Sequence, residues 1–120
     1  MQLNHLNLSV PNALDAAAFF EKYLGFTIKM ATPQRHIIAM SGAEFDLVLQ
    51  ECAGEELRYP GNFHIGFIVA DLAQLHGLYQ RLQADAYPLK TGIESSDRGW
   101  QFFFLLPGGV LIEIAWHGQR

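Results

Sequence analysis

Residues 62–71 read NFHIGFIVAD and contain the clearest local pattern in the chain. A histidine opens a short run in which alternate positions are apolar, as in a β-strand with one face toward a core. Asp71 then stands where a helix N-cap is favoured, with Gln74 three residues later in the spacing of a capping box. The stretch therefore predicts a strand that leads directly into a helix.

The same order of residue types occurs near the start of the chain, in residues 4–12, which read NHLNLSVPN. His5 corresponds to His64, an offset of 59 residues (64 − 5) that also aligns the two helices that follow. Apolar residues recur at helical spacing in both. The first helix carries Ala13, Ala16, Phe19, Phe20 and Tyr23, and the second carries Leu72, Leu75, Leu78, Tyr79 and Leu82. Two related βαβββ modules of about 60 residues are therefore expected.

The expected boundaries are residues 1–51 for the first module, 52–61 for a linker and 62–120 for the second module. The linker reads CAGEELRYPG and has no sustained hydrophobic period. Because a module of about 60 residues is small for an independent core, the two modules are expected to pack as one α+β domain.

Apolar runs and turn residues predict the remaining elements. In the first module we expect strands at 3–10, 26–30, 35–40 and from Phe45, a helix to about Leu24, and a turn at Ser41-Gly42. In the second we expect a strand at 86–90, a polar loop at 91–99, a strand buried on both sides at 100–106, a turn at Pro107-Gly108-Gly109, and a last strand at 110–116.

Composition excludes several classes of function. The formal net charge is −4, with eight Lys and Arg among 120 residues, which argues against a nucleic-acid partner. No apolar run approaches the ~20 residues that span a bilayer, and the start of the chain lacks the features of a signal peptide. The single cysteine, Cys52, has no partner for a disulfide or a CxxC motif. A cytoplasmic protein without a membrane partner is expected.

Three residues that can bind a metal ion share one strand parity. His5, His64 and Glu113 each lie on the strand face opposite the one that packs on the helices. Glu113 stands in an apolar strand, where a carboxylate is costly to bury without a cation or hydrogen bonds. Two imidazoles and a carboxylate suit Zn, Fe, Mn, Ni or Co and leave positions open for water or substrate. The alternative for each residue alone is an ordinary solvated strand residue.

The paired modules, the opening histidine of each, and the closing run PGGVLIE at 107–113 resemble the vicinal oxygen chelate superfamily of glyoxalases, bleomycin resistance proteins, fosfomycin resistance proteins and extradiol dioxygenases. The resemblance covers essentially the whole chain. It implies tandem βαβββ modules that form cupped, mixed and mostly antiparallel sheets, with a divalent metal ion between them. It also implies a homodimer in which His5 comes from one subunit and His64 with Glu113 from the other.

The resemblance departs from particular members at several positions. Val48 stands where glyoxalase I has a glutamate that binds metal and moves a proton, which a valine cannot do. Asp46 and Gln50 flank it on the same face and would replace it if the register slipped by two residues. Fosfomycin enzymes have a lysine where this chain has Ile93 and a Ser-Glu-Gly run where it has residues 97–99. For the extra histidine of extradiol dioxygenases the only candidate is His117.

Further residues are candidates to contact a substrate. Asn7, Asp46 and Gln50 lie on the expected face of His5, with solvated polar groups as the alternative. Arg98 has the forked donors that bind a carboxylate, although a loop arginine is commonly only solvated. Phe103 would wall an apolar cavity or belong to the core.

The sequence thus predicts a divalent-metal-dependent enzyme of the glyoxalase/dioxygenase type with Glu113 as its catalytic carboxylate. It would act on a small substrate through two vicinal oxygens, as an isomerase, lyase, transferase or ring-cleaving dioxygenase. The alternative is a metal-free, bleomycin-resistance-like dimer that sequesters a ligand. A purely structural module is a third interpretation, but it leaves Glu113 in an apolar strand without a role.

Overall fold

The computed structural model describes residues 1–52 and 57–118. The chain divides into two compact units, Met1–Arg58 and Tyr59–Arg120. The boundary falls inside the expected linker at 52–61, of which residues 53–56 lie outside the described residues. Within the described part, each unit contains one helix and one four-stranded sheet.

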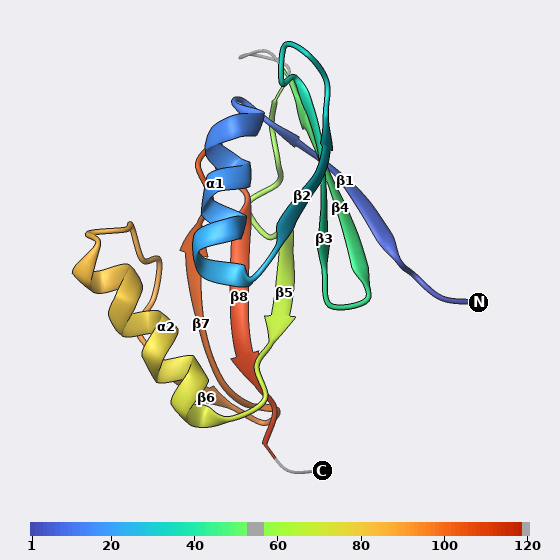
Figure 1. Ribbon diagram of the computed structural model, residues 1–120. Helices are drawn as coiled ribbons and strands as arrows, with labels where there is room; N and C mark the ends of the chain where they lie inside the picture. The colour runs from blue at the N-terminus through green and yellow to red at the C-terminus, as the bar shows by residue number, and fades with distance from the viewer. Residues whose placement is uncertain (53–56, 119–120) are drawn as a thin grey trace. The chain divides into compact units, whose positions relative to one another are not determined.

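The first unit contains β1 (His5–Val10), α1 (Ala13–Leu24), β2 (Thr27–Ala31), β3 (Ile37–Gly42) and β4 (Phe45–Glu51). The strand order is β1-β4-β3-β2. β1 pairs with β4 in parallel, and the other pairs are antiparallel. α1 covers one face of this sheet (Figure 1). The covered face and the helix supply the core residues Leu8, Val10, Phe20, Ile38, Met40, Leu47 and Leu49.

Local interactions fix both ends of α1, which ends at Leu24 as expected. The Asn12 side chain accepts a hydrogen bond of 2.9 Å from the Asp15 N–H and so caps the first turn. Gly25 ends the helix with φ of 74°, in the left-handed region that favours glycine. A carboxylate oxygen of Glu51, at the end of β4, accepts a further bond of 3.1 Å from the Ala13 N–H. The helix start is therefore tied to the sheet.

The second unit repeats the plan with β5 (His64–Ile68), α2 (Leu72–Ala84), β6 (Glu94–Ser96), β7 (Gly99–Leu105) and β8 (Leu111–Trp116). Its order is β5-β8-β7-β6, with β5 and β8 parallel and the other pairs antiparallel. α2 lies along one face of the sheet (Figure 1). The core residues are Leu75, Leu82, Phe102, Phe104, Ile112 and Ile114. Tandem βαβββ modules with mixed, mostly antiparallel sheets are thus confirmed.

The expected turn at Ser41-Gly42 is wrong. Both residues belong to β3, and the turn is at residues 43–44, where Glu44 has φ of 59°. Gly42 pairs with Phe45 across the hairpin. A Cβ at Gly42 would lie 2.6 Å from the Phe26 ring, so the glycine serves close packing and not the turn.

The expected strand at 86–90 and loop at 91–99 are also wrong. Ala86 follows α2 with φ of 55°, which does not fit a strand. Among residues 86–90, all of which the structure describes, the only strand-like pairing is an isolated bridge from Leu89 to Phe104. β6 forms instead inside the expected loop and pairs with β7 around a turn at residues 97–98. All three β6 residues are exposed, so this edge strand has no apolar alternation to reveal it.

The strand expected at 100–106 is present as β7, but it is not buried on both sides, and Trp100 near its start is 40% exposed. Phe102 and Phe104 are 0% exposed, whereas Gln101, Phe103 and Leu105 on the other face are half-buried. A continuous apolar run arises here because the face opposite α2 is itself partly apolar. In the part of the chain that the structure describes, neither helix is long and apolar enough to span a membrane.

Candidate metal centre

His64 and Glu113 lie side by side on the face of the second sheet that is opposite α2. Glu113 pairs with Gly66, two residues beyond His64 on the neighbouring strand. The distance from His64 Nε2 to Glu113 Oε1 is 3.4 Å, with side-chain exposures of 42% and 23%. Ile112 and Ile114, on either side of Glu113, point to the helix and are fully buried. Strand alternation therefore places the carboxylate on the open face, next to the imidazole.

The hydrogen bond at Nδ1 of His64 determines whether Nε2 faces Glu113 with a proton or with a lone pair. Nδ1 lies 3.0 Å from the main-chain carbonyl oxygen of Asn62. Because a carbonyl only accepts, Nδ1 carries the proton, and in the neutral ring the lone pair of Nε2 faces the carboxylate. A lone pair and a carboxylate oxygen at this distance repel each other unless a proton or a cation lies between them. Metal-binding histidines commonly donate a hydrogen bond from one ring nitrogen, as Nδ1 does here, and bind the ion through the other.

The spacing of the two groups fits a shared metal ion. Ligand atoms about 2.1 Å from one ion in tetrahedral geometry lie about 3.4 Å from each other. The His64–Glu113 separation equals this value. The pair is therefore suited to supply one nitrogen and one oxygen ligand.

His5 opens β1 with an exposed side chain and is held in a similar way. Its Nδ1 lies 2.9 Å from the side-chain oxygen Oδ1 of Asn4, so the ring presents Nε2. Within the described residues, neither module alone gathers three His, Cys, Asp or Glu side chains that would hold an ion. The first module supplies one candidate ligand, and the second supplies two.

Strand pairing gives the register at Val48 directly. In the second sheet Glu113 pairs with Gly66, two residues after His64. In the first sheet Val48 pairs with Asn7, two residues after His5. Val48 therefore occupies the place of Glu113, without a two-residue slip that would bring Asp46 or Gln50 there. A valine has no atom that binds a metal ion.

The other polar candidates of the first module lie on the open face with His5 but already have partners. Asn7 donates a hydrogen bond of 3.1 Å from Nδ2 to Gln50 Oε1. Asp46, which pairs in register with His5, lies 3.8 Å from the Lys29 ammonium. These groups form a polar surface around His5.

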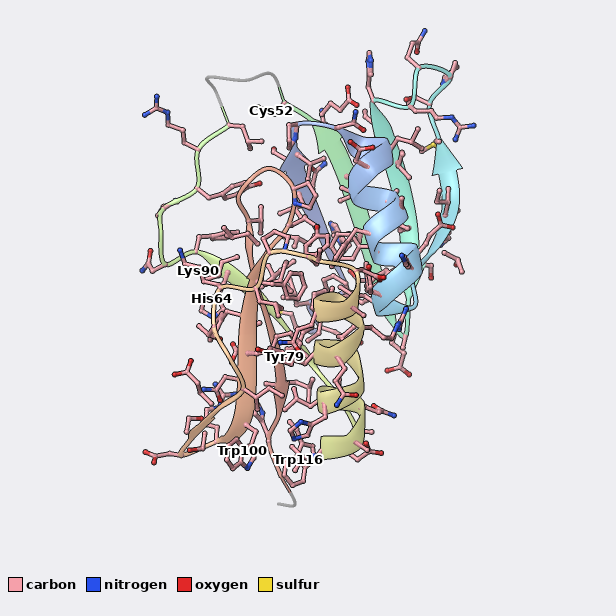
Figure 2. All side chains as sticks on the ribbon, turned by 90° about the vertical axis from the view of Figure 1, so that its left-hand side faces the viewer. Cys52, His64, Tyr79, Lys90, Trp100 and Trp116 are labelled. Atoms are coloured by element: carbon pink, nitrogen blue, oxygen red, sulfur yellow. The ribbon has the colours of Figure 1, made fainter. Side chains whose placement is uncertain are left out.

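In the second module, Phe103 adjoins the His64–Glu113 pair and Arg98 does not. The Phe103 and His64 rings meet edge to face with centroids 5.7 Å apart, and Phe103 pairs in register with Glu113. Arg98 lies in the β6–β7 turn, five residues from Phe103, or about 16 Å along a strand. That end of the sheet carries Trp100 and Trp116, with His64 toward the other end (Figure 2). His117 follows the end of β8 and is not a strand residue.

The residues that orient the two histidines were not predicted from the sequence. Asn4 uses its side chain and Asn62 its main-chain carbonyl. The sequence does contain a signal, because an asparagine stands within two residues before each histidine. Sequence analysis also assigned no role to Gly66, a glycine in the interior of a strand.

The chain belongs to the Glyoxalase/Bleomycin resistance protein/Dioxygenase superfamily, whose model matches residues 2–114. A solved structure of a possible glyoxalase from Bacillus cereus is 31% identical, with a TM-score of 0.82 over 95% of this chain and 97% of that one. A lactoylglutathione lyase from Agrobacterium tumefaciens has the same fold at 17% identity, with a TM-score of 0.77 over 96% and 92% of the two chains. No match to a curated protein was found.

Proposed function

We propose that this protein is a divalent-metal-dependent enzyme that acts on a small substrate through two adjacent oxygens. The observation that carries the proposal is the 3.4 Å separation of His64 Nε2 and Glu113 Oε1, with Nδ1 already engaged. His5, His64 and Glu113 would hold the ion, which is Fe, Mn, Zn, Ni or Co. When bound, such an ion supplies Lewis-acid chemistry to the two oxygens of the substrate.

The protein groups have distinct roles in this proposal. Glu113 is the catalytic carboxylate, since it would contact both the ion and the reacting oxygens. Asn7, Gln50 and Asp46 are polar groups for the substrate, and Phe103 is an apolar wall, whereas Arg98 is too far along the sheet to take part. Because Val48 replaces the second carboxylate, a proton transfer at that position is not part of the proposal. Isomerase, lyase, transferase and ring-cleaving dioxygenase reactions are all compatible with the remaining groups.

The proposed assembly is a cytoplasmic homodimer in which each site takes His5 from one subunit and His64 with Glu113 from the other. Support comes from the position of His5 in one unit and of His64 with Glu113 in the other, so that neither unit alone contains all three residues. The proposed partner is a small molecule and neither nucleic acid nor membrane.

A metal-free protein that sequesters a ligand is the second candidate function. Two observations favour it: Val48 removes one ligand position, and Ile68 on the open face is an apolar side chain that is 60% exposed. In such a protein the His64–Glu113 pair would be an ordinary ion pair with a protonated histidine.

Elemental analysis of protein purified without a histidine tag distinguishes the two functions. The wild type is compared with the His5→Ala and Glu113→Ala variants, and with Asp46→Ala as a control on the same face as His5. The proposed enzyme requires near-stoichiometric metal in the wild type and the control, and its loss in the other two variants. No metal in the wild type after incubation with Fe²⁺, Mn²⁺, Zn²⁺, Ni²⁺ and Co²⁺ would overturn it in favour of sequestration.

A further inference from the structure

We propose that Gly66 keeps open an apolar subsite beside Glu113, which receives an aromatic or branched aliphatic group of the substrate. The side chain at position 66 would then determine the size of the ligand. This inference deepens the proposed function, on which it relies for the polar end of the ligand.

The backbone at Gly66 does not itself require glycine. Gly66 is an interior residue of β5, and its φ is not positive, unlike that of Gly25 or Gly99. The pairing of β5 with β8 runs from His64 to Ile68 without a bulge. An interior strand glycine costs about 0.5–1 kcal/mol relative to alanine, and commonly marks a place where a ligand or another backbone approaches closely.

Packing within the module does not require glycine either. A Cβ at position 66 would lie 3.5 Å from Glu113 Oε1 and 3.8 Å from Glu113 Cβ, which are ordinary contact distances. The missing side chain therefore leaves a gap directly beside the carboxylate. A ligand group in this gap would touch the side of Glu113.

The side chains near the gap include apolar ones as well as His64 and Glu113, and Gln101 lies on the same face of β7 as Phe103. Ile68 follows on the same face of β5 and is 60% exposed. Phe103, in register with Glu113 on the other side, is half-buried and contacts the His64 ring. An apolar group bound here would cover Ile68 while its oxygens remain near His64 and Glu113.

The first sheet has a different residue at the equivalent position. Asn7 pairs with Val48 as Gly66 pairs with Glu113, and its side chain donates to Gln50. That place is therefore filled by a polar group. Of the two sheets, only the second combines a gap with a carboxylate and apolar neighbours, as a ligand with a polar head and an apolar substituent requires.

Two chelators that differ only in their apolar group test the subsite on metal-loaded protein. Benzohydroxamate and acetohydroxamate both present two adjacent oxygens, and their dissociation constants are compared for the wild type and Gly66→Val. We expect the wild type to prefer benzohydroxamate by about tenfold or more, equivalent to about 1.4 kcal/mol. Gly66→Val should abolish the preference without changing metal content or acetohydroxamate binding. Equal preference in both proteins would overturn the inference.

Matched variants guard against a folding defect. Gly66→Ala, whose Cβ fits at 3.5 Å, should reduce the preference by about threefold and retain the fold. Gly77→Ala adds the same atom in open space on α2 and should leave the preference unchanged. A loss of preference in Gly77→Ala equal to that in Gly66→Ala would contradict a local subsite.

A measurement on metal-free protein separates failure of the subsite from failure of the proposed function. Benzyl alcohol is titrated into ¹⁵N-labelled protein, and amide shifts are followed by NMR. We expect saturable shifts centred on Gly66, Ile68 and Phe103 in the wild type, and their absence in folded Gly66→Val. Without such shifts in the wild type the subsite is refuted, even if metal binds. If they occur in a protein that binds no metal, the subsite stands and the enzyme proposal fails.

Discussion

One of the two histidines is oriented by a side-chain oxygen and the other by a main-chain oxygen, so substitution of single residues can test their roles. His5 Nδ1 lies beside the side-chain oxygen of Asn4, whereas His64 Nδ1 lies beside the main-chain oxygen of Asn62. Removing the partner that orients a metal-binding histidine commonly weakens metal binding 10- to 100-fold. Asn4→Ala should therefore raise the dissociation constant for Zn²⁺ by about tenfold, measured by competition with a chelator.

The matched control is Asn62→Ala, which removes a side chain and retains the carbonyl. Its Zn²⁺ affinity should equal that of the wild type. Because Asn4 and Asn62 are both exposed, neither change should alter the free energy of unfolding by more than about 0.5 kcal/mol. Equal affinities in Asn4→Ala and the wild type would contradict a role for His5 as an oriented ligand.

At this scale the sequence predicted which face each candidate ligand occupies. Period-two alternation fixes the face of His5, His64 and Glu113, because a strand residue has only two sides. Alternation contains no information about side-chain torsions, so the Nδ1 partners emerged only from the structure. The separation of His64 and Glu113 likewise depends on the pairing of β5 with β8.

At the level of elements, Glu51 connects β4 to the start of α1. One of its carboxylate oxygens accepts the Ala13 N–H at 3.1 Å, and the other lies 3.6 Å from His36 Nε2. Glu51→Ala leaves a helix N–H without its acceptor, and should lower the free energy of unfolding by about 1–2 kcal/mol in a urea titration. Glu51→Gln, which retains an acceptor, should lose less than half of that amount.

His36→Ala separates the two contacts of Glu51. The His36 side chain is 65% exposed, so its ion pair with Glu51 should contribute at most about 0.5 kcal/mol. A loss in His36→Ala as large as in Glu51→Ala would mean that the ion pair, and not the helix cap, ties α1 to β4.

Gly42 and Gly77 form a second pair of tests at the level of elements. A Cβ at Gly42 would meet the Phe26 ring at 2.6 Å, and that ring is buried and packed against Phe20 at 5.5 Å between centroids. Gly42→Ala should lower the free energy of unfolding by about 1–3 kcal/mol. Gly77→Ala, in open space within α2, should raise it by up to about 1 kcal/mol. Equal effects would contradict the packing explanation for Gly42.

Local signals predicted the elements well wherever a turn or cap depends on nearby residues. Asp71 caps α2 as expected, and Asn12 and Gly25 limit α1 in the same local way. The prediction failed between α2 and β7, where β6 is a short exposed edge strand held by its pairing with β7. Edge pairing is a long-range interaction that leaves no local period. The turn at Ser41-Gly42 was predicted wrongly for a related reason, because Gly42 leaves room for the Phe26 ring and does not form a turn.

At the level of the whole molecule, the two modules share a topology but differ in the number of candidate metal ligands. Both modules pair their strands in the same register, but Val48 stands where the second module has Glu113. If each site takes its ligands from two subunits, two variants that each lack a different ligand should form one intact site in a mixed dimer. His5→Ala and Glu113→Ala chains, mixed after unfolding and refolded together, should recover about a quarter of the metal sites, because half of the dimers are mixed and each has one intact site of two.

Each variant refolded alone should bind no metal, which provides the baseline. When the double variant His5→Ala/Glu113→Ala is refolded with wild type, the metal content of the mixture should not exceed the amount expected for its wild-type fraction. Metal content that stays at the baseline in a mixture whose mixed dimers are confirmed by mass spectrometry would place all the ligands of a site in one chain.

In the proposed site, one ion is bound by a histidine from each module together with Glu113. X-ray absorption at the zinc edge tests it most directly, because imidazole rings give a distinctive scattering pattern that counts the histidine ligands. We expect two imidazoles for the Zn²⁺-loaded wild type. We expect one for His5→Ala and one for His64→Ala, each measured in excess Zn²⁺ so that some metal binds. One imidazole or none in the wild type would contradict it.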